Sequence, residues 1–282
     1  MTQAATLYII ATPIGNLEDM TYRAVRILGE VDLIAAEDTR HSLKLLNHFG
    51  ISKPLTSYFD HNQQLKGERI LNALRQGKSV ALISDAGTPC VSDPGYQLVR
   101  DAVAEQIRVV PLPGSCAAIT ALSASGLPSD TFTFAGFPPS RQGKRRTFLT
   151  GMATLPGTLI LYEAPHRLLQ TLQDVKELLG ERHIIVAREL TKIYEEFIRG
   201  TVSEVMRSLD PEAIRGEVAL LIAPGEQTEP EHESLASVLE RLMADQSLSI
   251  KDCAREAAAM SGISRSEAYQ EALRLKNIRD SA

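Results

Sequence analysis

The chain has 282 residues, of which 44% are hydrophobic and 23% are charged, a balance typical of a soluble globular protein with a sizeable core. Its formal net charge of −5 argues against a protein that coats nucleic acid over its whole surface, so a nucleic-acid site would be a local basic patch. No apolar run approaches membrane-spanning length, and the N-terminus lacks the layout of a signal peptide. We therefore expect a cytoplasmic protein without a membrane segment.

The first 123 residues alternate between apolar runs and amphipathic stretches. Strands are expected at 6–13, 32–38, 54–60, 79–85 and 107–113, and several of the helical patterns between them end at glycine. Such alternation predicts a parallel sheet with helices on both faces, in an N-terminal α/β domain over 1–123. The turn-rich stretch 124–131 marks its end.

The rest of the chain divides into three parts. Residues 124–225 predict a second α/β domain of mixed strand direction, with strands at 131–137, 157–165, 182–190 and 216–225. Residues 226–234 are polar and glutamate-rich, which indicates a solvated linker. Residues 235–282 predict a small helical domain in which "SIKDCAREAAAMSG" and "SRSEAYQEALRLKN" form two helices, capped by Ser249 and by Ser264 or Ser266. The layout fits a helix-turn-helix, but it lacks a basic face, which favours a docking role.

The unusual residues gather where the first five strands end. The segments there are "ATPIGNLED", "AAEDTRH", "SYFDHN", "SDAGTPCVSDPG" and "PLPGSCAA". In open parallel sheets, ligands bind beyond these ends, and glycine and proline suit a loop whose backbone touches a ligand. The motifs of P-loop NTPases, Rossmann dehydrogenases and α/β-hydrolases are missing. The three cysteines, Cys90, Cys116 and Cys253, lie far apart without a zinc-ligand pattern, so we expect reduced thiols and no metal site.

Four motifs in order, "TPIGNLEDMTYRA", "AEDTRHS", "SDAGTPCVSDPG" and "PLPGSCAAITAL", resemble the signature loops of the tetrapyrrole methylase superfamily. Within it, the chain resembles the ribosomal RNA small subunit methyltransferase I group along its whole length. This resemblance implies two α/β domains of the tetrapyrrole methylase type with a cleft between them, S-adenosylmethionine as cofactor, and a homodimer. It also implies 2′-O-methylation of a cytidine in the decoding centre of 16S rRNA, within an assembled or assembling small ribosomal subunit.

The resemblance also implies where the cofactor binds. Gly87-Thr88-Pro89 stands where many superfamily members have Gly-Asp-Pro, which leaves Asp85 as an alternative source of the polar contact. For Cys116 we favour a small buried apolar residue over a redox role. The implied cofactor contacts are Ile14, Asp85, Gly87, Thr88, Val91, Cys116, Ala117, Glu163, Ala164 and Leu190.

Methyl transfer to a ribose hydroxyl needs in-line placement of oxygen, carbon and sulfur, together with a proton acceptor. The candidate acceptors follow the second and third strands: Glu37, Asp38, Asp60 and His61. Glu37 and His61 are the favoured catalytic residues, with Glu37 slightly ahead because a carboxylate also complements a sulfonium. Asp38 is equally well explained as a helix cap.

A basic cluster in "SRQGKRR" stands out in this acidic chain. It consists of Arg141, Lys144, Arg145 and Arg146, and we expect it to hold RNA phosphates rather than only to face solvent. Arg40 either pairs with Glu37 or Asp38 or holds a phosphate. The cluster and the helical tail disfavour a precorrin-type tetrapyrrole C-methyltransferase. The five ligand-type strand ends disfavour a non-enzymatic nucleic-acid-binding module built on the tail.

Overall fold

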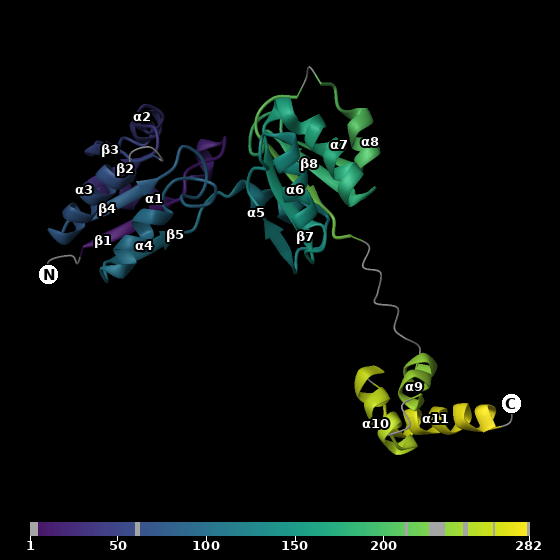
Figure 1. Ribbon diagram of the computed structural model, residues 1–282. Coiled ribbons are helices and arrows are strands. Elements are labelled where there is room, and N and C mark those ends of the chain that lie inside the picture. Colours follow the sequence, from purple (N-terminus) through teal and green to yellow (C-terminus); the bar gives the residue numbers. More distant parts are fainter. Residues whose placement is uncertain are drawn as a thin grey trace. The chain divides into compact units, whose positions relative to one another are not determined.

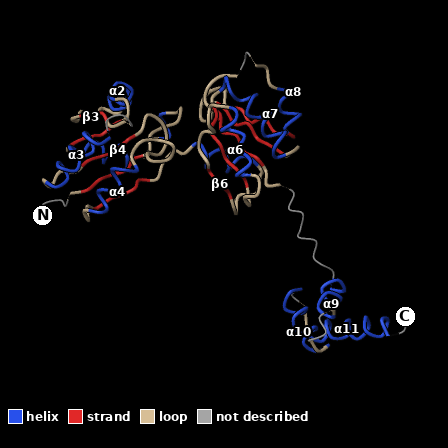
Figure 2. The backbone as a smooth tube through the Cα atoms, viewed as in Figure 1, coloured by secondary structure: helices blue, strands red, loops and turns tan. Residues whose placement is uncertain are grey.

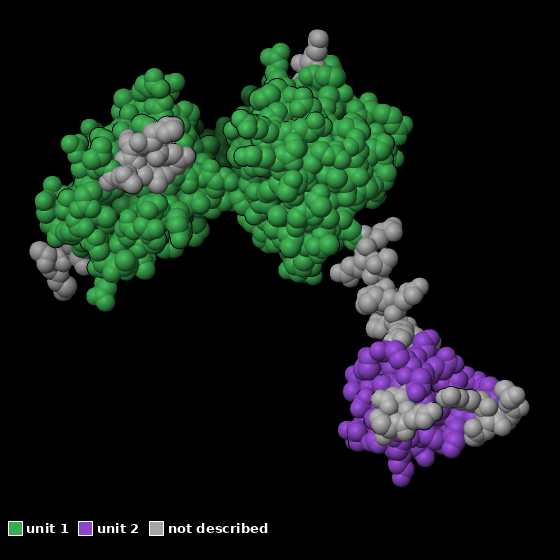
Figure 3. Space-filling model, in the orientation of Figure 1, with its two compact units in different colours: residues 1–225 green, residues 226–282 purple. Residues whose placement is uncertain are grey.

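The computed structural model describes residues 5–59, 63–211, 214–225, 235–244, 248–261 and 263–280. It divides into two compact units, Met1–Gly225 and Glu226–Ala282 (Figure 3). The first unit holds two five-stranded sheets, and the second holds helices (Figure 2). No helix within the described ranges is long and apolar enough to cross a bilayer.

The first sheet is entirely parallel, as predicted. Its strands β1 (Thr6–Ile10), β2 (Leu33–Ala36), β3 (Leu55–Ser57), β4 (Val80–Ile83) and β5 (Arg108–Leu112) lie in the order β3-β2-β4-β1-β5 (Figure 1). β4 is buried on both faces, which explains its unbroken apolar sequence. Because parallel strands share one carboxyl edge, the loops after β1 and β4 lie side by side, where Thr12 and Gly87 form a bridge.

Helices cover both faces of this sheet. Leu28 of α1 (Tyr22–Glu30) and Leu46 of α2 (Thr39–His48) pack on one face, around Ile34. Ile70 of α3 (Gln63–Arg75) and Leu98 of α4 (Tyr96–Ala104) pack on the other. The two-sided covering predicted from the strand–helix alternation is therefore confirmed.

The second sheet has mixed strand directions. Its order is β6-β7-β10-β8-β9, with β6 parallel to β7 and the other pairs antiparallel. The strands are β6 (Phe132–Phe134), β7 (Thr158–Glu163), β8 (His183–Arg188), β9 (Glu196–Thr201) and β10 (Val218–Ile222). Strand β9 was not predicted, because this edge strand is only half-buried and its sequence lacks a strong apolar pattern.

Different helices cover the two faces of the second sheet. α5 (Ala117–Ser125) packs on one face through Ala118, Ala121 and Leu122. The other face carries α6 (Gln142–Met152), α7 (Leu168–Leu179) and α8 (Val202–Ser208). Single-turn 3₁₀ helices lie at Leu17–Asp19 and Pro165–Arg167. Since α5 directly follows β5, the chain passes from the first sheet to the second at the loop before Ala117.

The C-terminal unit contains α9 (Leu235–Met243), α10 (Ile250–Ser261) and α11 (Arg265–Asp280). Two helices were expected, and α9 is an addition. Its Leu239 packs on an alanine-rich core that includes Cys253. Ser249 caps α10 by accepting from the Asp252 N–H, and Ser264 caps α11 by accepting from the Glu267 N–H, as the sequence predicted.

Candidate active site

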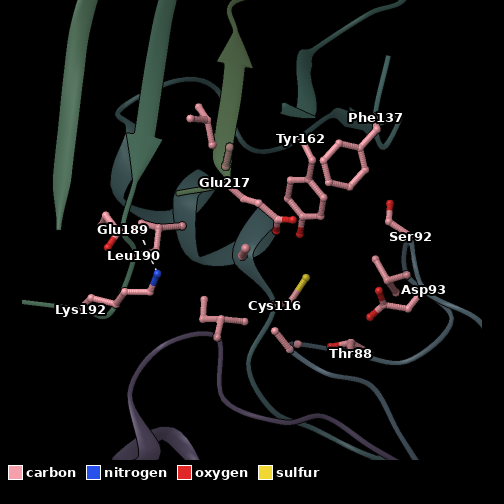
Figure 4. A pocket seen from close by; sticks show the side chains of 17 residues that line it. Thr88, Ser92, Asp93, Cys116, Phe137, Tyr162, Glu189, Leu190, Lys192 and Glu217 are labelled. Carbon is pink, nitrogen blue, oxygen red and sulfur yellow. Dashed lines mark hydrogen bonds and ion pairs between the residues drawn. The ribbon is translucent and has the colours of Figure 1, made fainter. Parts of the chain in front are cut away.

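A cavity of about 340 Å³ lies in the first unit, between loops that follow strands of the first sheet and residues of the second sheet (Figure 4). Its walls come from the loops after β1, β4, β6 and β8, the start of α5, strand β7, and β10 with the residue before it. The lining residues are Ile14, Ala86, Gly87, Thr88, Val91, Ser92, Asp93, Cys116, Ala117, Phe137, Tyr162, Glu189, Leu190, Lys192, Glu217, Val218 and Ala219.

The loop after β4 is held in an uncommon conformation. Gly87, Cys90 and Ser92 have φ of 83°, 70° and 61°, in the left-handed region that non-glycine residues rarely adopt. Gly87 and Thr12 exchange backbone hydrogen bonds of 3.0 and 2.9 Å, and the Ser84 hydroxyl donates to the Gly87 carbonyl at 3.1 Å. These bonds fix the loop against the end of β1. Because its side chains are small, the backbone of the loop is accessible from the cavity.

The start of α5 forms a second wall beside an aromatic group. Cys116 is the N-cap of α5, and the Tyr162 hydroxyl accepts a hydrogen bond of 3.0 Å from the Ala118 N–H. Burial raises the pKa of Tyr162, which stays neutral. The rings of Phe134 and Phe137 contact Tyr162 edge-on, with centroids 4.8 and 5.5 Å away. This wall offers a helix N-terminus, which favours anions, and a flat aromatic surface.

Acidic side chains supply most of the charge at the cavity. Figure 4 shows the Asp93 carboxylate directed inward from the loop after β4, and Glu217 extending from the second sheet. Burial, reinforced by repulsion from Glu37, raises the pKa of Asp93 to about 6, although a hydrogen bond with Ser84 acts in the opposite direction. The cavity therefore suits a ligand that carries positive charge.

The cation at the cavity wall, Lys192, is itself paired. Its ammonium lies 2.8 Å from the carboxylate of Glu189, which has φ of 50°. The Lys192 stem covers Gly15, where an added Cβ would lie 2.6 Å from the lysine Cγ. Gly15 therefore leaves the space in which Lys192 reaches the cavity.

A family model described as "Tetrapyrrole (Corrin/Porphyrin) Methylases" matches residues 6–206 of the chain. The chain belongs to the tetrapyrrole methylase family. A second model, "RsmI C-terminal HTH domain", matches residues 229–276. The resemblance drawn from the four loop motifs is thus confirmed, and so is the predicted fold class.

Sequence matches to similar proteins extend over nearly the whole length of this tetrapyrrole methylase. "Ribosomal RNA small subunit methyltransferase I" of Pseudomonas aeruginosa is 48% identical over 96% of this chain and 97% of its own. The protein of the same name from Halalkalibacterium halodurans is 52% identical over 83% of this chain and 82% of its own. Among solved structures, uroporphyrin-III C-methyltransferase of Thermus thermophilus, complexed with S-adenosylhomocysteine, has a TM-score of 0.54 at 18% identity, covering 77% of this chain and 97% of that one. At that identity the likeness concerns the fold alone.

The structure brings together most of the residues expected to contact the cofactor. Those that line the cavity of this methylase are Ile14, Gly87, Thr88, Val91, Cys116, Ala117 and Leu190. Asp85, Glu163 and Ala164 are not among the lining residues. The Asp85 carboxylate accepts from the Asp38 N–H at 3.0 Å. Glu163 is fully buried, where it accepts from the Ala164 N–H at 2.8 Å and pairs with Arg167 at 3.2 Å, so it anchors the segment after β7.

The candidate proton acceptors lie differently from the expectation. Glu37 is not a lining residue of the cavity, although its charge acts on Asp93. Asp38 caps α2 by accepting from the Arg40 N–H at 2.8 Å, which confirms the helix-cap interpretation. Its bonds to Arg40 lower the pKa of Asp38 to about 2. His61, with Asp60, lies outside the described residues.

The basic cluster divides into two kinds of residue. Arg145 is 2% exposed and pairs with the equally buried Asp174 at 2.7 Å, so the expectation that it contacts RNA is wrong. Arg146 pairs with the same carboxylate at 3.0 Å and also with Glu177, so its charge is largely neutralised within the protein. Arg141 and Lys144 lie exposed at the start of α6.

Sequence reasoning missed several residues of the cavity. Asp93 lies in a loop that the sequence analysis singled out, and its position directly before Pro94-Gly95 was an available signal. The other cavity residues not predicted from sequence are Ala86, Ser92, Phe137, Tyr162, Glu189, Lys192, Glu217, Val218 and Ala219. Most of these lie in the strands of the second sheet or in the segments next to them, and the position of that sheet against the first cannot be read from local patterns.

Proposed function

We propose that this methyltransferase uses S-adenosylmethionine to methylate the ribose 2′-oxygen of a cytidine in the decoding centre of 16S rRNA. The observation that carries the proposal is the extent of the match to proteins named ribosomal RNA small subunit methyltransferase I. At 48% identity over 96% of this chain, the match includes both the methylase region and the C-terminal helices. We extend the proposal to a cytoplasmic homodimer that acts on the assembled or assembling small ribosomal subunit.

The described cavity fits the cofactor in size and polarity. Its volume lies in the range of about 300–1,000 Å³ that small-molecule sites occupy. Ile14, Val91 and Leu190 give it apolar walls for an adenine, and the α5 N-terminus suits a carboxylate. Asp93 and Glu217 complement an ammonium and a sulfonium. When bound there, S-adenosylmethionine supplies an electrophilic methyl group, and the protein's task is to place the hydroxyl in line with it.

Placement is the largest contribution that we assign to the protein. Holding two reactants in a productive geometry lowers the barrier by about 7–11 kcal/mol. The fixed loop after β4 supports this role, because the bond between Ser84 and Gly87 and the exchange with Thr12 leave it little freedom. We propose that Arg141 and Lys144 hold RNA phosphates, joined by Arg40, whose side chain is 89% exposed beside Asp38.

The test is methylation of small ribosomal subunits purified from cells that lack this protein. We expect methyl-labelled S-adenosylmethionine to label one cytidine of 16S rRNA, located by nuclease digestion and mass spectrometry, with resistance of the adjacent bond to alkali showing 2′-O-methylation. Naked 16S rRNA and a tetrapyrrole are the comparison substrates. Labelling of the tetrapyrrole instead of RNA would overturn the proposal, and so would labelling of a base.

A further inference from the structure

Three acidic residues line the cavity, Asp93, Glu189 and Glu217, and of these Asp93 belongs to the loop after β4. Asp93 lines the cavity and points into it from the loop after β4 (Figure 4). The residue before it, Ser92, has φ of 61°, and the residue two places after it, Gly95, has φ of 143°. An added Cβ at Gly95 would lie 2.9 Å from a methyl carbon of Leu82 in the sheet. The backbone on both sides of Asp93 is thus held in conformations that side-chain-bearing residues rarely adopt.

The charged groups that face Asp93 come from both sheets. Burial first of all disfavours the ionised form of Asp93. Repulsion adds to it, from Glu37 at the end of β2, Asp85 after β4 and Glu217 before β10. Burial is the main cause that raises the pKa values of Cys90, in the same loop, and of Tyr162, on β7, and the charge of Asp93 adds to it. The cation at the cavity wall, Lys192, is paired with Glu189. Asp93 is therefore a partly buried carboxylate among other carboxylates.

We propose that Asp93 is the catalytic residue that takes the proton from the ribose 2′-hydroxyl during methyl transfer, an inference that rests on the proposed function. The hydroxyl oxygen forms its bond to the methyl carbon while the bond between that carbon and sulfur breaks. The electron pair of the broken bond stays on sulfur, which changes from a sulfonium to a neutral thioether. The hydroxyl proton passes to the Asp93 carboxylate, which releases it to water after the products leave.

The electrostatics of Asp93 suit this task. A general base works best when its pKa lies near the working pH, and the pKa of Asp93, about 6, leaves it ionised but basic near pH 7. Glu37, the acceptor favoured from sequence, does not line the cavity but raises the pKa of Asp93. Within this proposal, Glu37 is a positioning residue that acts only through the effect of its charge on Asp93.

The first experiment is calorimetry of cofactor binding and needs no RNA. A cationic sulfonium placed near Asp93 favours its ionised form, so S-adenosylmethionine should release protons on binding at pH 6, measured as a dependence of the binding heat on the buffer's ionisation enthalpy. Neutral-sulfur S-adenosylhomocysteine should release fewer. Asp93→Asn should abolish the difference between the two ligands, whereas Asp101→Asn, an exposed change on α4, should retain it. An unchanged difference in Asp93→Asn would overturn the inference.

The second experiment is single-turnover methylation of the small subunit between pH 5 and 9. Asp93→Asn should lower the rate by about 10²–10⁴-fold and remove the rise of the rate with pH, whose midpoint lies below about 6 because the bound sulfonium lowers the pKa of Asp93. Glu37→Gln should move the midpoint of the pH profile to lower pH and lower the plateau rate far less than Asp93→Asn does, because a weaker base remains in place. If Glu37→Gln instead loses the plateau rate while Asp93→Asn retains it, Glu37 is the base and this inference fails. If the wild-type protein itself does not methylate the subunit, the proposed function fails. In that case the calorimetric comparison of the two ligands still tests whether Asp93 faces the sulfonium.

Discussion

The buried pair of Arg145 on α6 and Asp174 on α7 offers a sharp test of how this fold is held together. Both side chains are 2% exposed, and the Arg145 Nε lies 2.7 Å from an Asp174 oxygen. The Nη1 of Arg145 has no hydrogen-bond partner within the described ranges. Asp174→Asn would leave a guanidinium buried without its counter-charge, which costs about 3–5 kcal/mol. For a unit of this size, the melting temperature should fall by about 6–20 °C.

The double variant Arg145→Met with Asp174→Leu separates the cost of an unpaired charge from the value of the pair. It removes both charges and the unpartnered Nη1, so we expect stability within about 1 kcal/mol of wild type, or higher. Glu177→Gln is the control, because it breaks only an exposed pair with Arg146 and should cost less than about 1 kcal/mol. Thermal and urea unfolding followed by circular dichroism give these values. A double variant as unstable as Asp174→Asn would refute the reasoning.

Three further predictions concern the cavity and the basic surface. Gly87→Ala, at φ of 83° on the cavity wall, should weaken S-adenosylmethionine binding at least about tenfold by calorimetry, a loss of 1.4 kcal/mol. Gly50→Ala, at φ of 66° with open space around it, is the control and should leave the affinity for S-adenosylmethionine unchanged. Replacing Arg141 and Lys144 with alanine should reduce the slope of log affinity for rRNA against log salt by roughly 1–2, with cofactor affinity intact, and an unchanged slope would show that they only face solvent. Because the pKa of Asp93 is raised in the folded protein, this group lowers the stability of the fold increasingly as pH rises from about 4 to about 6. Asp93→Asn should therefore be more stable than wild type at pH 8, by about 1–2 kcal/mol after allowance for partial exposure, and no more stable at pH 4. Melting curves at both pH values test this.

The local features of this protein follow from its sequence. The apolar run Val80–Ile83 has no polar face, so it fits only a strand covered on both sides, and the structure buries all of it. Ser249, Ser264 and Asp38 precede helices and cap them, because their side-chain oxygens reach the free N–H groups of the first turn. These outcomes depend on residues a few positions apart, so they can be read from the chain directly.

Contacts between distant segments were decided only by the tertiary structure. Arg145 belongs to a run of basic residues that looks like a phosphate site, yet its partner Asp174 lies 29 residues away on another helix and draws it into the core. Asp93 and Glu217 line the same cavity but belong to segments of different sheets, and no local sequence pattern relates them. The physical reason is that periodicity and capping act over one or two helical turns, whereas burial and charge pairing depend on which surfaces the completed sheets and helices bring together.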